Sequence, residues 1–256
     1  MYQQTAYLII ILIYGLLIGS FLNVCIYRIP IGNTIVKGRS YCPKCGSLIP
    51  WYLNIPLFSF LALKGRCRSC GAPISLRYPV VELLTAFLFL LVWLTYGFTP
   101  ESLLVITLFS VLVIISFIDF DLQIIPDGLV LIILVLGIIH GIYHCLDPEA
   151  NWYTWALGFL AASLPLFILG LIIQDSMGGG DIKLMAAAGL FTGARLILLA
   201  LFIGALYSLA YSVFILARKQ GSMKTAIPFG PFLSLGIATS ILFGDRLIIC
   251  YLSLFF

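Results

Sequence analysis

Residues 102–118 read SLLVITLFSVLVIISFI, a stretch without any charged side chain that ends directly at Asp119. A helix needs about 20 mainly apolar residues to cross the hydrocarbon core of a bilayer. Comparable apolar runs occur along the rest of the chain, at roughly 7–27, 79–98, 128–146, 152–174, 183–217 and 229–254. The sequence therefore predicts an all-α polytopic membrane protein.

The composition of the 256-residue chain agrees with this fold class. Hydrophobic residues make up 62% of the chain and charged residues only 9%, and the mean hydropathy is +1.15. Ordinary soluble domains contain about 25% charged residues. Water is therefore not the main solvent of this protein, and the composition excludes soluble enzymes and soluble binding domains.

The apolar run at 183–217 is too long for one crossing. It contains the sequence Thr192-Gly-Ala-Arg195, where a glycine and a charged residue interrupt the hydrophobic pattern. A glycine at such a point favours a break in the helix. We therefore expect two short helices in this run and about eight transmembrane helices in all.

The distribution of positive charge predicts the orientation of the chain. Residues 28–77 contain eight of the fourteen Lys and Arg residues and no Asp or Glu. Because cytoplasmic loops carry an excess of Lys and Arg, this loop is expected in the cytoplasm and the N-terminus outside. Counting crossings then places segments 119–127, 174–182 and 218–228 at the cytoplasmic face.

Residues 1–28 are expected to form a retained first transmembrane helix, because no basic residue precedes its apolar run.

Two CxxC pairs lie within the basic loop, Cys42-Pro-Lys-Cys45 and Cys67-Arg-Ser-Cys70, and a glycine follows each pair. Four thiolates at this spacing are typical of a zinc ribbon, in which the metal is tetrahedral. Disulfides are the weaker interpretation, because a cytoplasmic loop lies in a reducing compartment. Four cysteines fill the coordination shell, so the predicted Zn²⁺ is structural.

A basic zinc ribbon also raises the alternative of nucleic-acid binding. Anionic lipids at the cytoplasmic face explain the positive charge equally well. We therefore expect the lipid bilayer, and no nucleic acid, as the partner of this loop.

Two aspartates next to predicted membrane spans are the strongest candidates for chemistry. Ionisable side chains in or beside a span are costly and often functional. Asp119 directly follows an apolar run, and Asp181 follows the glycines 178–180 at the start of another run. The alternative for Asp181 is a helix cap, and the spacing alone does not exclude it.

Three other aspartates are expected near the same face. Asp121 is a reserve candidate for catalysis because it lies two residues beyond Asp119. Asp127 follows Pro126 and precedes a glycine and an apolar run, which is typical of a helix start. Asp175 follows a span and is equally well explained as a marker of the water boundary.

Two carboxyls at the same membrane depth predict acid–base hydrolysis. One carboxylate takes a proton from water as the general base, and the other, kept protonated, polarises the scissile carbonyl. The predicted topology places both Asp119 and Asp181 at the cytoplasmic edge. Their distance from each other cannot be read from a separation in sequence.

At these residues the sequence resembles the Gly-x-Gly-Asp membrane aspartyl proteases, and within them the prepilin peptidase family. The resemblance covers roughly residues 15–232. It is carried, in the order of the family, by Gly19-Ser-Phe-Leu-Asn-Val-Cys-Ile-Tyr-Arg-Ile-Pro30, the paired CxxC loop, Arg77-Tyr-Pro-Val-Val-Glu82, Asp119-x-Asp121, Ile125-Pro-Asp127 and Gly178-Gly-Gly-Asp181.

The resemblance implies an endopeptidase of the bacterial inner membrane. Members of the family cut the short basic leader from type IV prepilins and related pseudopilins at the cytoplasmic side. The family's catalytic aspartates map to Asp119 and Asp181. The chain then divides into the first transmembrane helix (1–28), the zinc-binding loop (29–78) and a membrane-embedded aspartyl protease domain (79–256).

The resemblance also implies a second activity. Many members methylate the new N-terminal amine with S-adenosylmethionine, which they bind through the region that holds the zinc loop. The sequence contains no motif of soluble methyltransferases, so the residues that bind this methyl donor stay unassigned. Glu82 is a candidate to orient the amine or the donor, and its alternative role is a first-turn acid facing the helix dipole near Arg77.

Two other classes of protein compete with a protease. A transporter or proton channel would use Asp119 and Asp181 as a proton relay. Transporters usually show two related halves with broken helices, whereas here one glycine break carries an aspartate and no half repeats the other. A membrane scaffold that holds a partner on the zinc loop would tolerate asparagine at both positions.

Overall fold

The computed structural model describes all residues except 1, 36–37, 146–152, 174–177, 219–226 and 255–256. The described residues form two compact units, Met1–Ile114 and Ile115–Phe256. In both units the chain is helical, and strand pairing is limited to two isolated bridges in the cysteine loop. The all-α class predicted from the sequence is confirmed.

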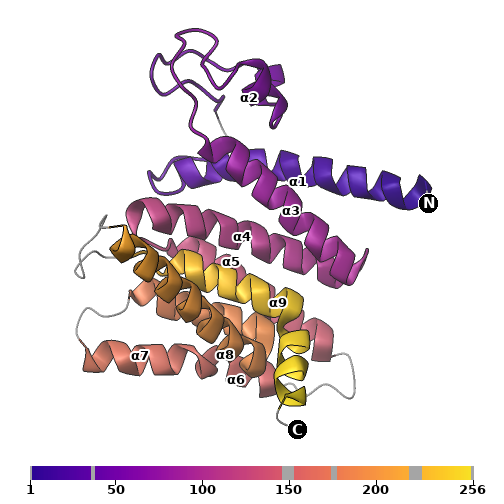
Figure 1. Cartoon of the computed structure of the whole chain (residues 1–256), viewed down its shortest axis with the longest axis vertical. Helices are drawn as coiled ribbons and strands as arrows, with labels where there is room; N and C mark the ends of the chain where they lie inside the picture. Colours follow the sequence, from indigo (N-terminus) through magenta and orange to yellow (C-terminus); the bar gives the residue numbers. More distant parts are fainter. Residues whose placement is uncertain (1, 36–37, 146–152, 174–177, 219–226, 255–256) are drawn as a thin grey trace. The chain divides into compact units, whose positions relative to one another are not determined.

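The first unit contains two long helices, most of a third, and a loop with short helical turns. α1 and α3 pack along each other, and the loop between them carries η1 and α2 (Figure 1). The bounds are α1 Tyr2–Arg28, η1 Trp51–Asn54, α2 Phe58–Ala62, α3 Arg77–Tyr96 and α4 Pro100–Leu122, whose last eight residues belong to the second unit.

The second unit is built around one long helix, α8, against which α5, α6, α7 and α9 pack. Small residues allow this packing. A Cβ atom on Gly158 of α6 would overlap the backbone carbonyl of Gly189 in α8, and the reverse also holds. Close backbone approach at small residues is a common way to join helices in membranes. The bounds are α5 Asp127–Cys145, α6 Tyr153–Ala161, α7 Ser163–Ile172, α8 Gly179–Ala217 and α9 Gly230–Ser253.

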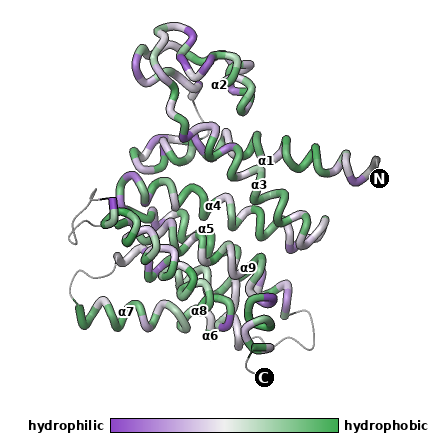
Figure 2. The backbone as a smooth tube through the Cα atoms, viewed as in Figure 1, coloured by the Kyte–Doolittle hydropathy of each residue, from purple (hydrophilic) through white to green (hydrophobic). Residues whose placement is uncertain are grey.

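Among the described residues, seven helical stretches are long and apolar enough to cross a membrane. Many of their large hydrophobic side chains are exposed, such as Phe202 on α8 and Leu171 on α7. Figure 2 shows hydrophobic residues along the long helices and hydrophilic residues mainly in loops and at helix ends. Such surfaces suit a lipid solvent, in which a helix satisfies its own backbone hydrogen bonds.

The break predicted at Thr192–Arg195 is present in α8. Gly193 has φ 79° and ψ 166°, a conformation that divides the 39-residue helix into two limbs. A straight helix of this length would extend about 58 Å at 1.5 Å per residue, well beyond a hydrocarbon core of about 30 Å. When the two limbs of α8 are counted separately, the seven stretches become eight segments, which agrees with the expected number of about eight.

A second break was not expected from the sequence. The apolar run from Tyr153 to Ile172 is interrupted at Ala162, which separates α6 from α7. Pro165 explains this position, because a proline donates no hydrogen bond to the carbonyl four residues earlier and its ring clashes with that carbonyl. The carbonyl in question belongs to Ala161, the last residue of α6.

Candidate active site and cysteine cluster

Asp119 lies in the last turn of α4, which ends three residues later at Leu122. Its side chain is buried, with a relative exposure of 5%. One carboxylate oxygen, Oδ2, accepts a hydrogen bond of 2.9 Å from the backbone N–H of Gly230. The carboxylate is therefore held at the N-terminal end of α9.

The N-terminus of α9 is suited to hold an anion. The first N–H groups of a helix have no partner within the helix, and the helix dipole favours negative charge there. Gly230 is the first residue of α9. A Cβ atom at this position would lie 2.7 Å from Asp119 Oδ2 and 3.0 Å from its Cγ. A side chain at position 230 would therefore displace the carboxylate from this backbone contact.

Asp181 lies in the first turn of α8, as the third residue of the helix, and Gly178 is the N-cap. Its carboxylate accepts a hydrogen bond from the backbone of Gly178, which is the acidic half of a capping box. The other oxygen, Oδ1, is buried and has no hydrogen-bond partner in the described part of the chain. Capping therefore accounts for only part of the environment of Asp181.

The fold brings the two aspartates together within the second unit. Asp119 lies close enough to Asp181 for their charges to interact. The glycine run contributes to this approach, because a Cβ atom on Gly180 would lie 2.9 Å from the Cβ of Ile125 in the connection after α4. The start of α8 therefore packs directly against the segment that follows Asp119.

The other aspartates of this face have different environments. Asp121 is exposed. Asp127 lies in the first turn of α5, as expected for a helix start, and its Oδ1 is 2.7 Å from the Nζ of Lys183 in α8. This ion pair joins the N-terminal parts of α5 and α8. Asp175 lies outside the described residues.

The cysteine cluster is assembled within the first unit. The Sγ atoms of Cys42, Cys45, Cys67 and Cys70 all lie within 4.8 Å of one another. In tetrahedral zinc sites, Zn–S distances of about 2.3 Å place the sulfurs about 3.8 Å apart. The four thiols are therefore close to the spacing that a single zinc ion requires.

Both CxxC pairs have the same backbone geometry. The N–H of Gly46 donates to the carbonyl of Cys42 at 2.8 Å, and that of Gly71 donates to Cys67 at 2.9 Å. Both glycines have positive φ, 70° and 69°, a conformation that costs glycine little. Each turn therefore brings the two cysteines of its pair close together, within the cluster of four thiols.

Local hydrogen bonds favour the thiolate form of two of these cysteines. Backbone N–H groups of Cys70 and Ser69 lower the pKa of Cys67 to about 6. The hydroxyl and the backbone N–H of Ser47 lower the pKa of Cys45. The neighbouring thiols raise the pKa of Cys70 to about 11. Because the thiolate is the form that binds metal, the hydrogen bonds to Cys67 and Cys45 favour metal binding at these two positions.

Glu82 lies in the second turn of α3, so its expected alternative role as a first-turn acid is wrong. The side chain is buried, and its Oε2 accepts a 2.9 Å hydrogen bond from the backbone N–H of Leu57. Leu57 has φ 57° just before α2. Glu82 therefore holds the loop in a conformation that non-glycine residues rarely adopt.

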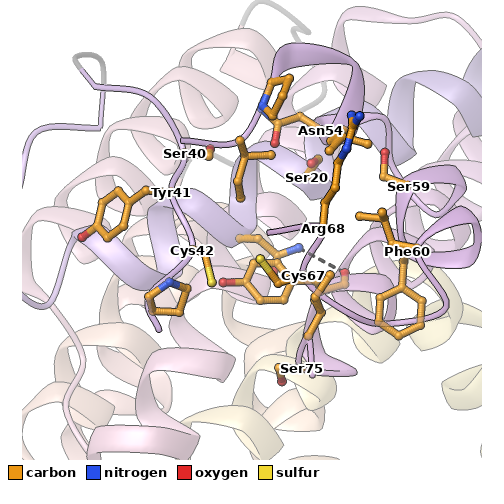
Figure 3. Close-up of a pocket in the computed structure, with 18 of the residues that line it drawn as sticks. Ser20, Ser40, Tyr41, Cys42, Asn54, Ser59, Phe60, Cys67, Arg68 and Ser75 are labelled. Atoms are coloured by element: carbon orange, nitrogen blue, oxygen red, sulfur yellow. Dashed lines mark hydrogen bonds between the residues drawn. The ribbon is translucent and has the colours of Figure 1, made fainter. Parts of the chain in front are cut away.

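A cavity of about 1010 Å³ lies between α1, α3 and the cysteine loop of the first unit. Its lining includes Glu82, Cys42 and Cys67. Figure 3 shows Ser20 of α1, Asn54 and Phe60 of the loop and Arg68 of the second cysteine turn around this pocket. Small-molecule sites commonly measure about 300–1,000 Å³, so the cavity has room for a ligand of that class.

Sequence reasoning missed Gly230 and Leu57. Each acts through a backbone N–H whose partner lies far along the chain, 111 residues away for Gly230 and Asp119 and 25 residues away for Leu57 and Glu82. A glycine just before Pro231 at the start of an apolar run marks the beginning of α9. Nothing in the sequence around Gly230 indicates that its hydrogen-bond partner is Asp119.

The comparisons with known proteins agree with this arrangement. The sequence model described as the bacterial peptidase A24 N-terminal domain matches residues 13–96, and that of the type IV leader peptidase family matches residues 106–213. A protein of Pseudomonas putida is 34% identical over 91% of this chain and 89% of its own length. The chain belongs to the type IV leader peptidase family. No solved structure matches it.

Other relatives of this leader peptidase family member carry the same printed name as the P. putida protein, prepilin leader peptidase/N-methyltransferase. A Bacillus subtilis protein is 32% identical over 96% of this chain and 98% of its own length. A Myxococcus xanthus protein is 39% identical over 77% of this chain, and the match spans 59% of the M. xanthus protein.

Proposed function

We propose that this protein is a membrane-embedded aspartyl endopeptidase that removes the leader from type IV prepilins or pseudopilins and then methylates the new N-terminal amine. The main support for this proposal is a pair of buried carboxyls that lie close together, Asp119 at the end of α4 and Asp181 at the start of α8. The names of the relatives support both activities. Neither they nor the fold supports the transporter alternative.

The proposed cleavage uses the two carboxyls with one shared proton. The ionised carboxylate takes a proton from water, whose oxygen attacks the scissile carbonyl carbon, and the protonated carboxyl donates its proton to the carbonyl oxygen. The tetrahedral intermediate then collapses and the C–N bond breaks. The leaving amine takes the proton that the base removed from water, and the hydroxyl that reforms the carbonyl returns its proton to the other carboxylate. The pair returns to its initial state with one proton.

Gly230 acts as a positioning residue in this scheme. Its N–H fixes one oxygen of Asp119. The second oxygen stays available for water or for the substrate carbonyl. Asp181 has a buried oxygen without a hydrogen-bond partner among the described residues, and a proton shared with Asp119 or a substrate atom would satisfy it.

The four cysteines fit a structural zinc ion. The donor set of four thiols, their mutual distances and the hydrogen bonds to Cys45 and Cys67 all suit tetrahedral zinc. Four protein ligands leave no position for water, so we assign no catalytic step to the metal. Its proposed role is to hold the two cysteine turns against each other beside the cavity of the first unit.

The methyl donor is proposed to be S-adenosylmethionine, which supplies an electrophilic methyl group. The cavity of the first unit, with its volume of about 1010 Å³, is the proposed place of this reaction. The basic loop is proposed to lie at the cytoplasmic face of the bacterial inner membrane, with the N-terminus outside, on the basis of its positive charge.

Incubation of the purified protein with a prepilin and S-adenosylmethionine, followed by mass spectrometry, tests the proposal. The expected product lacks the leader and carries the mass of one methyl group. Uncut substrate would contradict the peptidase. A cut product without the methyl mass would contradict only the second activity.

A further inference from the structure

The cavity of the first unit contains one carboxylate among many neutral and basic side chains. Glu82 is the only acidic residue in its lining, and Lys44 and Arg68 lie in the same lining. A buried carboxylate is costly unless a cation or hydrogen-bond donors compensate it. Two donors already reach it: the backbone N–H of Leu57, which occupies Oε2, and the hydroxyl of Ser20 in the same lining. A carboxylate can accept several hydrogen bonds through its two oxygens, so Glu82 retains capacity for a ligand.

A second hydrogen-bond acceptor in the lining of this cavity belongs to α1. Asn23 is buried with 4% exposure and belongs to the same lining. Its Nδ2 donates to the carbonyls of Gly19 and Tyr78, at 3.3 and 3.1 Å. Both donors of the amide therefore point to carbonyls, which fixes its orientation. The oxygen, Oδ1, is left without a partner in the described part of the chain.

The packing of α1 on α3 places these two residues one helical turn apart along the contact between the helices. A Cβ atom on Gly19 would lie 2.7 Å from the Cα of Glu82, and Asn23, four residues later, bonds to Tyr78, four residues before Glu82. The two antiparallel helices therefore present Asn23 and Glu82 at successive turns of one seam. An ammonium group, which has three donors and no acceptor, matches a carboxylate next to an unsatisfied amide oxygen.

We propose that Glu82 and Asn23 form a binding site for an α-ammonium group in the methyl-transfer cavity. This inference rests on the proposed methyltransferase activity. Two reactants carry such a group, namely the newly exposed N-terminus of the cleaved substrate and the methionine part of S-adenosylmethionine. The shared chemistry is an α-ammonium held by one carboxylate and one amide oxygen.

Glu82 has a further role when the bound group is the N-terminus. The ammonium first gives up one proton, which Glu82 accepts. The amine nitrogen then attacks the methyl carbon with its lone pair, and the sulfur keeps the electron pair of the broken S–C bond. The products are a methylated ammonium and a neutral thioether, and the proton passes from Glu82 to water.

Glu82→Gln tests the site with little change in shape. The amide oxygen of glutamine can still accept the hydrogen bond from Leu57, but the negative charge is lost. Calorimetry measures the binding of a mature unmethylated peptide without methyl donor, and of S-adenosylmethionine without peptide. We expect one of these dissociation constants to rise at least about tenfold, because a charge-assisted hydrogen bond becomes a neutral one. A rise for the peptide assigns the site to the N-terminus, and a rise for the donor assigns it to the methionine ammonium.

Asn23→Leu is the second variant. It should weaken the binding of the same ligand that Glu82→Gln affects. Glu101→Gln, the same chemical change in the first turn of α4, is the matched control and should leave both constants unchanged. Cleavage of prepilin and zinc content report whether each variant is folded. Unchanged binding of both ligands in folded Glu82→Gln or Asn23→Leu would overturn the site. Loss of cleavage in the unaltered protein would instead contradict the peptidase and leave these binding results interpretable.

Discussion

Gly230 has no functional side chain, yet its backbone N–H positions the proposed catalytic carboxyl of Asp119. We predict that Gly230→Ala lowers the rate of prepilin cleavage by about 10-fold or more. The added Cβ would lie 2.7 Å from Asp119 Oδ2, so the carboxylate must move or lose its hydrogen bond, and misplacement by about 1 Å can cost about 100-fold. Kinetics of cleavage with a purified prepilin measure this effect.

The matched control is Gly128→Ala, because a Cβ at Gly128 in the first turn of α5 would meet no atom within 4 Å. Its cleavage rate should stay close to that of the unaltered protein. Equal rates for Gly230→Ala and Gly128→Ala would contradict the positioning role.

The pairing of Asp119 with Asp181 predicts how cleavage depends on pH. At low pH both carboxyls carry a proton and no base remains, and at high pH both are ionised and no proton donor remains. The rate of cleavage should therefore follow a bell-shaped curve, whose two apparent pKa values belong to the pair rather than to either residue. A rate that stays flat through the acid range would rule out this mechanism.

Sequence reasoning found the side chains of the site more readily than their partners. The choice of Asp119 over Asp121 came from the family resemblance, and the burial of Asp119 beside an exposed Asp121 supports it. The four cysteines were found because ligand spacing is local. Gly230 and Leu57 were missed, because a backbone donor carries no chemical signature and its distance from the acceptor is set by folding.

At the scale of the elements, the break at Gly193 shapes α8. We predict that Gly193→Ala destabilises the protein by about 1–3 kcal/mol, since φ 79° with ψ 166° is a region that residues other than glycine rarely adopt. Thermal unfolding in detergent should show a lower midpoint.

Gly141→Ala in α5 provides the comparison for this change, because its Cβ would meet nothing within 4 Å and its backbone is not left-handed. Its midpoint should stay the same or rise. A midpoint for Gly193→Ala as high as that of Gly141→Ala would mean that the break is not required for stability.

The cysteine loop is the second element with a direct test. We predict about one zinc ion per chain in the purified protein, and loss of this zinc from Cys42→Ser after dialysis against a chelator, because metal affinity depends on the full set of ligands. Elemental analysis measures the zinc content.

Cys250→Ser, at an exposed position in α9 far from the cluster in sequence, should retain its zinc. Equal zinc contents in the two variants would contradict the assignment of Cys42 as a ligand.

The elements themselves were largely predictable, and their interruptions were only partly so. The glycine with its charged neighbour marked the break of α8 within the sequence. The break at Ala162 was missed because Pro165 lies inside a strongly apolar run. The hydrogen bond that this proline removes would have ended at the carbonyl of Ala161, four residues earlier. Apolar composition reports that a segment enters the membrane, whereas single glycines and prolines decide where its helix ends.

At the scale of the whole molecule, the two compact units correspond to two proposed chemistries. The second unit holds the aspartate pair, and the first holds the cysteine cluster and the cavity with Glu82. Variants in one unit should therefore separate cleavage from methylation. The domain bounds expected from the sequence, at residues 28 and 78, stay a prediction.

The central claim is that Asp119 and Asp181 are the catalytic pair. The most direct measurement is the rate of prepilin cleavage by purified Asp119→Asn and Asp181→Asn, each compared with Asp121→Asn and checked for zinc content. We predict that both variants lose at least about 100-fold in rate, because each removes a general acid or base, while Asp121→Asn stays active and all three retain zinc. Cleavage at the unaltered rate by a folded Asp119→Asn or Asp181→Asn would contradict the claim.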